Sequence, residues 1–279
     1  MLVPPPFQRL SLITGAQAIS ALRKTRVILF GAGGVGSWCA EALARSGVGT
    51  ITLADSDAVC ITNINRQVQA AHSTLGQPKA GALKTRLEDI NPAGVFSAFP
   101  QAFSRETAQS FGIEGFAYVI DAIDTLTHKL DLIEYACRAG KTLFSSMGMA
   151  QKLDPTRLKT AGIWETQGCP LARLVRSGLR RRGFAGNFIT VYSTERLPLR
   201  RESGAALACG SGRCLCPGHE KENKEDKEKK ENKEWCASKK VINGSAVPVT
   251  AAAGMILASL VIRDICAAAG PGGHGGNGL

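Results

Sequence analysis

The sequence lacks the segments that would send a chain through or into a membrane. Its first residues do not show the charged, apolar and small-residue order of a signal peptide. The longest apolar run, 246–262, is broken by proline, glycine and hydroxyl residues and falls short of the roughly 20 residues that span a bilayer. We therefore expect a cytoplasmic protein without a membrane partner, in which this run is a strand end followed by a buried helix.

Paired C-x-x-C spacings, typical of zinc knuckles, are also missing. Nine cysteines in a cytosolic chain of this length do not indicate a disulfide framework. Cys169, directly before Pro170, is expected to be structural. A reactive role would need an electropositive setting that activates the thiolate, and the sequence does not show one. Four further cysteines are spaced C-x4-C-x-C-x19-C, which leaves a zinc-stapled loop open beside a mobile, reduced insert: Cys209, Cys214, Cys216 and Cys236.

Positive charge is in excess, with a formal net charge of +11. This balance favours an anionic partner such as nucleic acid. Basic residues are concentrated in one later part of the chain, where they can neutralise RNA phosphates or form a solvated helix face. They are Arg157, Lys159, Arg173, Arg176, Arg180, Arg181, Arg182, Arg196, Arg200 and Arg201.

Short apolar runs alternate with helical patterns, which predicts an α/β fold with a Rossmann-like, mostly parallel sheet and flanking helices. Strands are expected near 27–30, 50–54, 118–121, 141–145 and 187–193, and helices near 16–23, 37–45, 78–90, 127–139 and from 170 onward. The expected division is an N-terminal segment 1–25, a nucleotide-binding unit 26–145, a C-terminal part of the same domain 146–266 with a Cys- and Lys/Glu-rich insert at 201–240, and a disordered tail 267–279.

A glycine-rich turn follows the first predicted strand. Gly31, Gly33 and Gly36 have the G-x-G-x-x-G spacing, which lets backbone N–H groups approach a phosphate at the start of a helix. Asp55 follows the next strand, where an acidic residue meets ribose hydroxyls. NAD, flavin and adenylating enzymes all use this pattern, so it leaves a dinucleotide and ATP open.

Charged side chains near the turn favour ATP over a dinucleotide. Arg66 and Lys79 suit a triphosphate, whose negative charge must be neutralised as pyrophosphate leaves. Asp124 follows a strand at the same edge and is a candidate for holding Mg²⁺. Each also has a plain structural alternative as an ion pair, a helix start or a helix cap. The full set is Asn63, Asn65, Arg66, Gln67, Lys79 and Asp124.

Four segments, GAGGVG, DSDAVCITNINRQ, GQPKA and DAIDT, resemble the E1-like adenylating superfamily of ThiF/MoeB/HesA type, whose members activate carboxylates with ATP. The resemblance implies ATP and Mg²⁺ as cofactors and a homodimer. It assigns phosphate contacts to Gly31, Gly33, Gly34 and Gly36, a ribose contact to Asp55, triphosphate contacts to Asn63, Arg66 and Lys79, and Mg²⁺ to Asp124. Arg66, Lys79 and Asp124 are the implied catalytic residues.

Later segments narrow this resemblance to one branch. SSMGMAQKLDPTRLK, CPLARLVRSGLRRRG, VYSTE and INGSAVPVTAAAGMILASLVIRDI resemble, in order, the tRNA threonylcarbamoyladenosine dehydratases. That branch implies an enzyme that adenylates the carboxylate of a modified adenosine in the anticodon region of tRNA. An intramolecular attack then closes the threonylcarbamoyl group into a ring and releases AMP.

The chain departs from the family pattern in two places. The leading segment reads Leu12 to Gly15 where the family usually carries an Arg-Leu-Tyr-Gly type sequence, so an arginine that could reach a neighbour's ATP is missing unless Arg9 substitutes for it. Asn243 stands where some members have a cysteine, so no thioester can form there. Two other functions stay open: an activator of a sulfur-carrier or ubiquitin-like protein, and a non-catalytic nucleotide- or RNA-binding module.

Overall fold

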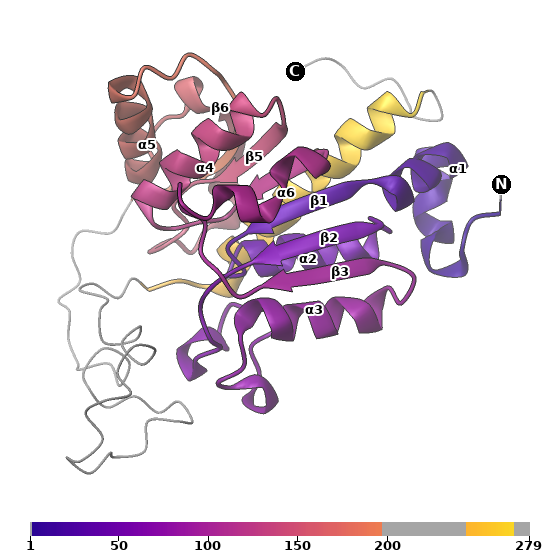
Figure 1. Ribbon diagram of the computed structural model, residues 1–279. Coiled ribbons are helices and arrows are strands. Elements are labelled where there is room, and N and C mark those ends of the chain that lie inside the picture. Colours follow the sequence, from indigo (N-terminus) through magenta and orange to yellow (C-terminus); the bar gives the residue numbers. More distant parts are fainter. Residues whose placement is uncertain (1, 197–243, 271–279) are drawn as a thin grey trace, which may run out of the picture.

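A seven-stranded sheet forms the centre of this computed structural model, which describes residues 2–196 and 244–270. Figure 1 shows the sheet with helices packed around it. The strand order is β3-β2-β1-β4-β5-β7-β6, and only the edge strand β6 runs antiparallel to its neighbour. The predicted α/β fold with a mostly parallel sheet is confirmed. The strands are β1 (Arg26–Phe30), β2 (Thr50–Ala54), β3 (Val95–Phe99), β4 (Tyr118–Asp121), β5 (Thr142–Ser146), β6 (Leu158–Gly162) and β7 (Ile189–Ser193).

Helices cover both faces of the sheet. One apolar core joins the sheet to α1, α2, α3 and α6, and a second joins it to α4, α5 and the turns before β4. Side chains alternate between these cores along β1, which explains why it reads as a continuous apolar run. The helices are α1 (Gln8–Lys24), α2 (Gly36–Arg45), α3 (Lys79–Ile90), α4 (Leu126–Arg138), α5 (Pro170–Arg181) and α6 (Val247–Ala268).

Seven short 3₁₀ helices lie in the described connections. They are η1 (Pro5–Phe7), η2 (Ile61–Asn63), η3 (His72–Thr74), η4 (Ala108–Phe111), η5 (Ile113–Gly115), η6 (Pro155–Arg157) and η7 (Ile163–Glu165). η2 belongs to the loop after β2, which contributes Asp55, Asn63, Asn65, Arg66 and Gln67 to the predicted site.

The sequence did not predict the two edge strands, β3 and β6. Val95 is 60% exposed, and in β6 only Gly162 is buried while Lys159 and Thr160 are exposed, so neither strand shows the strong apolar run of a central strand. The leading helix α1 is also longer than expected. It starts at Gln8 and is kinked at Gly15, whose φ of 82° only glycine adopts readily.

Helix α6 corrects the interpretation of the long apolar run. Its first turn includes Pro248, so the expected strand end is wrong for 247–250, and the helix continues for 22 residues. Its length and composition are those of a membrane-crossing helix. It nevertheless packs along α2 and buries Val249, Ala253 and Leu257 in the sheet's core. The helix reaches Ala268, two residues into the predicted tail, while the predicted insert and residues 271–279 lie outside the described part.

A buried ion pair ties α4 to the ends of β4 and β5. Lys129 Nζ lies 2.6 Å from Asp121 Oδ2, and neither side chain is exposed. Lys129 also donates to the Ser146 carbonyl at 3.0 Å, and Ser145 Oγ donates to Asp121 Oδ2 at 2.6 Å. The other carboxylate oxygen accepts from the N–H of Ile123 at 3.0 Å. The pair therefore fixes the loop after β4.

Removing Lys129 should destabilise the fold strongly, because Asp121 would remain buried without a compensating charge. We expect Lys129→Met to lower the free energy of unfolding by about 3–5 kcal/mol in urea titrations, and the double variant with Asp121→Asn to recover part of the loss. Lys84→Met is the matched control, since Lys84 pairs with Glu88 on an open helix face and its loss should cost at most about 1 kcal/mol. Equal losses for the two single variants would contradict the role of the buried pair.

Candidate functional site

The loops after β1, β2 and β4 meet at one edge of the sheet, the edge formed by the carboxyl ends of its parallel strands. β1 lies between β2 and β4, so the chain order of the strands reverses there. Open α/β sheets bind their ligands in the crevice at such a reversal. The glycine-rich turn follows β1, Asp55 follows β2 and Asp124 follows β4.

The glycine-rich turn has a crowded side and an open side. Gly31 has a φ of +94°, and a Cβ there would lie 2.6 Å from the Ala122 carbonyl oxygen. A Cβ at Gly36 would lie 1.9 Å from the Gly31 carbonyl oxygen, whereas one at Gly33 would meet nothing within 4 Å. The turn therefore excludes side chains where α2 begins and leaves room at Gly33 for a phosphate to reach backbone N–H groups.

Asp55 is bonded to the turn and to its own loop. Its Oδ2 accepts from the N–H of Ala32 at 2.7 Å, and its Oδ1 accepts from the N–H of Asp57 at 2.8 Å. Burial raises the pKa of Asp55, while the nearby Lys79 charge opposes this shift. Each carboxylate oxygen can accept a second hydrogen bond, so the group can hold the turn and still receive ribose hydroxyls.

Lys79 is paired within the chain. The side-chain Nζ of Lys79 lies 2.5 Å from Asp57 Oδ2, and the backbone N–H of Lys79 donates to the Asp57 backbone carbonyl at 2.8 Å. Asp57 was not predicted as a site residue, although the Asp-Ser-Asp motif after β2 places a second acidic residue beside Asp55. The structure thus places Lys79 near Asp55 with its charge compensated, and its predicted contact with a triphosphate stays a prediction.

Arg66 lies directly against the glycine turn. A Cβ at Gly34 would be 3.3 Å from Arg66 Cγ, and Trp38 Nε1 donates to the Arg66 carbonyl at 3.0 Å. The guanidinium donates to the Thr62 carbonyl at 2.7 Å and to Asn65 Oδ1 at 3.0 Å. It takes part in none of the ion pairs within residues 2–196 and 244–270.

Burial lowers the pKa of the Arg66 guanidinium. The negative charge of Asp124 opposes this shift, so Asp124 is near enough to Arg66 to interact with its charge. An arginine keeps its charge despite such a shift. A partly desolvated guanidinium without a carboxylate partner, beside an open backbone turn, favours an anionic ligand.

The two asparagines of the same loop bond to the chain's own backbone. Asn63 Oδ1 accepts from the N–H of Cys60 at 3.0 Å, and Asn65 Nδ2 donates to the Ser245 carbonyl at 2.8 Å. Gln67 is buried beside them. These contacts stabilise the loop and join it to the start of α6, and any contact of Asn63, Asn65 or Gln67 with a nucleotide stays a prediction.

Asp124 is exposed at the crevice, and its recorded contact is a 3.4 Å hydrogen bond from Thr125 Oγ1. The described ranges contain no group of three or more His, Cys, Asp or Glu residues arranged for a metal. Mg²⁺ that arrives with a nucleotide needs only one or two carboxylates beside the phosphates, so a single free carboxylate fits it. The four cysteines of the zinc alternative fall outside the described residues.

The predicted basic residues fall into two groups in the structure: some have hydrogen-bond or ion-pair partners within the protein, and others are exposed. Arg176 donates to the Thr166 carbonyl at 2.9 Å, and Arg182 is 2.8 Å from carboxylate oxygens of both Asp131 and Glu134. Arg157 lies 3.4 Å from Asp154. The residues that stay exposed and outside the recorded ion pairs are Lys159, Arg173, Arg180, Arg181 and Arg196, while Arg200 and Arg201 lie outside the described part.

Cys169 and Glu195 belong to the segments that resemble the dehydratases, and both have contacts that support the fold. Cys169 is 4% exposed within the core formed by α4 and α5, which favours its predicted structural role. Glu195, in the VYSTE segment, accepts from the N–H groups of Leu153 and Asp154 at 3.0 to 3.1 Å. It therefore holds the loop after β5 against the end of β7.

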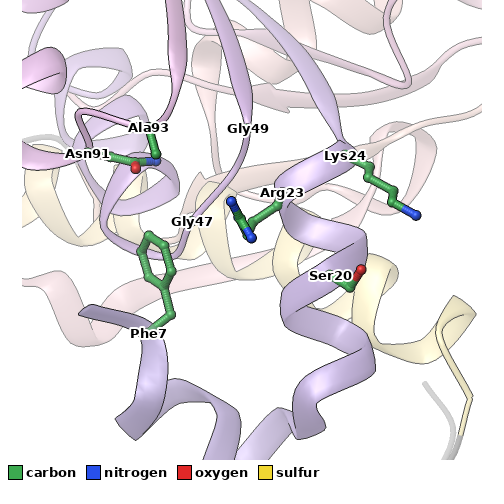
Figure 2. Close-up of a pocket in the computed structure, with 8 residues that line it drawn as sticks. All are labelled: Phe7, Ser20, Arg23, Lys24, Gly47, Gly49, Asn91 and Ala93. Carbon is green, nitrogen blue, oxygen red and sulfur yellow. The ribbon is translucent and has the colours of Figure 1, made fainter. Parts of the chain in front are cut away.

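A hollow of about 250 Å³ lies at the opposite edge of the sheet (Figure 2). Phe7, Arg23 and Asn91 line it from η1, the last turn of α1 and the end of α3, and Gly49 lines it just before β2. Because it lies where β2 begins and the glycine turn lies where β1 ends, this hollow is separate from the candidate site.

Comparisons with known proteins identify the family of this chain. A model of the ThiF family matches residues 7–272. The tRNA threonylcarbamoyladenosine dehydratase of Bacillus subtilis (strain 168) is 43% identical over 203 residues, which cover 71% of this chain and 80% of that protein. A crystal structure of the E. coli tRNA N6-threonylcarbamoyladenosine dehydratase with AMP has a TM-score of 0.78 and 28% identity, covering 96% of this chain and 98% of that one.

The same E. coli enzyme in complex with ATP has a TM-score of 0.76 and 28% identity over 96% of this chain and 98% of that one. The family match extends through both apolar cores and the glycine turn. The chain therefore belongs to the ThiF family.

Proposed function

We propose that this protein is a tRNA threonylcarbamoyladenosine dehydratase that uses ATP to adenylate the carboxylate of N6-threonylcarbamoyladenosine in tRNA and promotes its dehydrative cyclisation. The observation that carries this proposal is Arg66, a partly desolvated guanidinium without a recorded ion pair beside the open side of the turn. The dehydratases of B. subtilis and E. coli support the substrate class.

The chemistry needs two displacements. A carboxylate oxygen of the substrate attacks the α-phosphorus of ATP, and pyrophosphate leaves. An atom of the threonylcarbamoyl group then attacks the activated carbonyl carbon, and AMP leaves with the carboxylate oxygen. The tRNA thus loses the elements of one water, and ATP is converted to AMP and pyrophosphate.

The site residues can be given roles in this scheme. Backbone N–H groups of Gly31 to Gly36 would hold phosphates, and Asp55 would receive the ribose hydroxyls while it keeps the turn in place. Arg66 and Lys79 would neutralise the charge of the departing pyrophosphate, with Lys79 shared between Asp57 and the phosphates. Asp124 would hold the Mg²⁺ that accompanies ATP.

The two alternative functions explain the observations less well. An activator of a carrier protein would use the same nucleotide site, but the B. subtilis dehydratase matches over 80% of its own length. A binding module without turnover has no departing pyrophosphate, so the charges of Arg66, Lys79 and Asp124 would lack the catalytic role that the family resemblance gives them. We also propose a cytoplasmic location, as expected from the sequence.

The N-terminal half of α5 is the proposed contact for tRNA phosphates. A Cβ at Gly148, which follows β5, would lie 3.4 Å from Leu171 Cβ. Helix α5 therefore begins near the carboxyl ends of the strands, where the candidate site lies. Arg173 is exposed in this first turn, whereas Arg180 and Arg181 stand near the other end of the helix. Exposed guanidinium groups there can neutralise phosphates of the anticodon region.

A homodimer is proposed through α6 and the edge strand β6. Met255 is 42% exposed on α6, and Leu158, Ile256 and Leu260 line a hollow between the two elements. Because β6 ends the sheet and α6 is strongly apolar, this face suits burial against a second copy.

Arg66→Ala should lower the rate of tRNA dehydration by about 100-fold or more, because a charge that stabilises departing pyrophosphate is lost. Purified protein is incubated with ATP, Mg²⁺ and tRNA carrying threonylcarbamoyladenosine, and mass spectrometry of the digested nucleosides follows the loss of one water. Asp124→Ala should behave similarly. Arg138→Ala, an exposed arginine at the end of α4, is the control. Full activity of Arg66→Ala would contradict the proposed site.

Arg173→Glu should weaken tRNA binding and reduce the slope of log affinity against log salt by about one phosphate contact. Lys24→Glu makes the same change of net charge at the opposite edge of the sheet and should alter affinity less. Filter binding at several salt concentrations measures both variants. If Arg173→Glu and Lys24→Glu weaken tRNA binding equally, α5 does not contact the tRNA.

Met255→Asp should convert the dimer into monomers, because a carboxylate would be buried without a partner at the interface. Light scattering after gel filtration gives the mass of each species. Val95→Asp places the same charge on the other edge strand and should leave the dimer intact. A dimer that survives Met255→Asp would show that another face pairs.

A further inference from the structure

Gln69 carries the sole buried side-chain nitrogen or oxygen without a hydrogen-bond partner in the part of the chain that the structure describes. The side chain is 3% exposed, and the atom in question is Oε1. The amide nitrogen, Nε2, donates to the Ala32 carbonyl oxygen at 2.8 Å. Since a carbonyl only accepts, the nitrogen has to face Ala32, and Oε1 has to point elsewhere.

Ala32 belongs to the glycine turn and is held at both ends. Its N–H donates to Asp55 Oδ2 at 2.7 Å, and its carbonyl accepts from Gln69. The peptide groups before and after Ala32 are therefore both fixed by buried or half-buried side chains. Asp55 is among the predicted site residues, whereas Gln69 is not.

The unpartnered oxygen is unfavourable for the fold of the free protein, because burial removes water without supplying a donor. Methionine has a similar length and would fill the space without an unsatisfied atom. It would, however, leave the Ala32 carbonyl without the amide that holds it. The amide therefore matters less for the stability of the free protein than for the position of the turn.

We propose that Gln69 is a positioning residue of the ATP site, which presets the backbone N–H groups of the turn through its hydrogen bond to the Ala32 carbonyl. Gln69 touches the turn through Ala32 and acts on phosphates only through it. The inference rests on ATP being the ligand of this turn, as the proposed function states. Replacing the amide should weaken ATP binding while the stability of the free protein changes little, because one unsatisfied atom is exchanged for another.

The test is thermal unfolding of the full chain in the absence of nucleotide and across a titration with ATP and Mg²⁺. Gln69→Met removes one unsatisfied atom, Oε1, but leaves the buried Ala32 carbonyl without its donor, so its unfolding temperature without ATP should stay close to that of the wild type. Its Kd for ATP should rise about fivefold to tenfold, the effect of one lost hydrogen bond. In the dehydration assay KM for ATP should rise more than kcat falls. Gln77→Met is the matched control, because Gln77 is exposed and its amide donates only to the Ser73 carbonyl at 3.2 Å.

Gln69→Glu is a second variant that keeps the side-chain volume and places an acceptor opposite the Ala32 carbonyl. It should also weaken ATP binding. An ATP affinity equal to that of the wild type in either folded variant overturns the inference, provided that the wild type itself responds to ATP. A wild type that shows no stabilisation by ATP overturns the proposed nucleotide site, and this inference with it.

Discussion

The hydrogen bond from the Ala32 N–H to the Asp55 carboxylate joins the ends of β1 and β2, and the rest of the site is arranged around it. The same carboxylate accepts from the N–H of Asp57, and Asp57 in turn pairs with Lys79 at the start of α3. One acidic side chain therefore sets the relative position of the turn, the loop after β2 and α3. Its two oxygens serve the backbone and still have lone pairs for a ligand.

The positively charged side chains around this crevice differ in whether a carboxylate of the protein compensates their charge. Lys79 and the buried Lys129 each lie within 2.6 Å of a carboxylate, so their charges are largely compensated inside the protein. Arg66 has backbone and amide partners but no recorded ion pair. An incoming polyphosphate would therefore gain most from Arg66, while Lys79 would have to divide its attraction between Asp57 and the ligand.

The sequence predicted what depends on local pattern and missed what depends on distant contacts. The central strands and the helices α2, α3 and α4 were placed within one or two residues, because buried strands and amphipathic helices leave clear periodicities. The edge strands β3 and β6 carry weaker patterns and were missed. Asn65 bonds to Ser245, 180 residues away, and no local pattern could show that contact. Gln69 likewise looks like any polar loop residue until its amide is seen against Ala32.

Helix α6 links the nucleotide turn to the outer surface of the molecule. Thr250, in its first turn, lies close enough to the glycine turn that a Cβ at Gly34 would be 3.2 Å from Thr250 Cβ. About one turn further along, Met255 is exposed on the face proposed for the second copy. Helix α6 thus contacts both the nucleotide turn and the face proposed for the second copy. A second chain packed against Met255 would press on the same helix whose Thr250 lies beside Gly34, so the proposed pairing face and the wall of the nucleotide turn share one element.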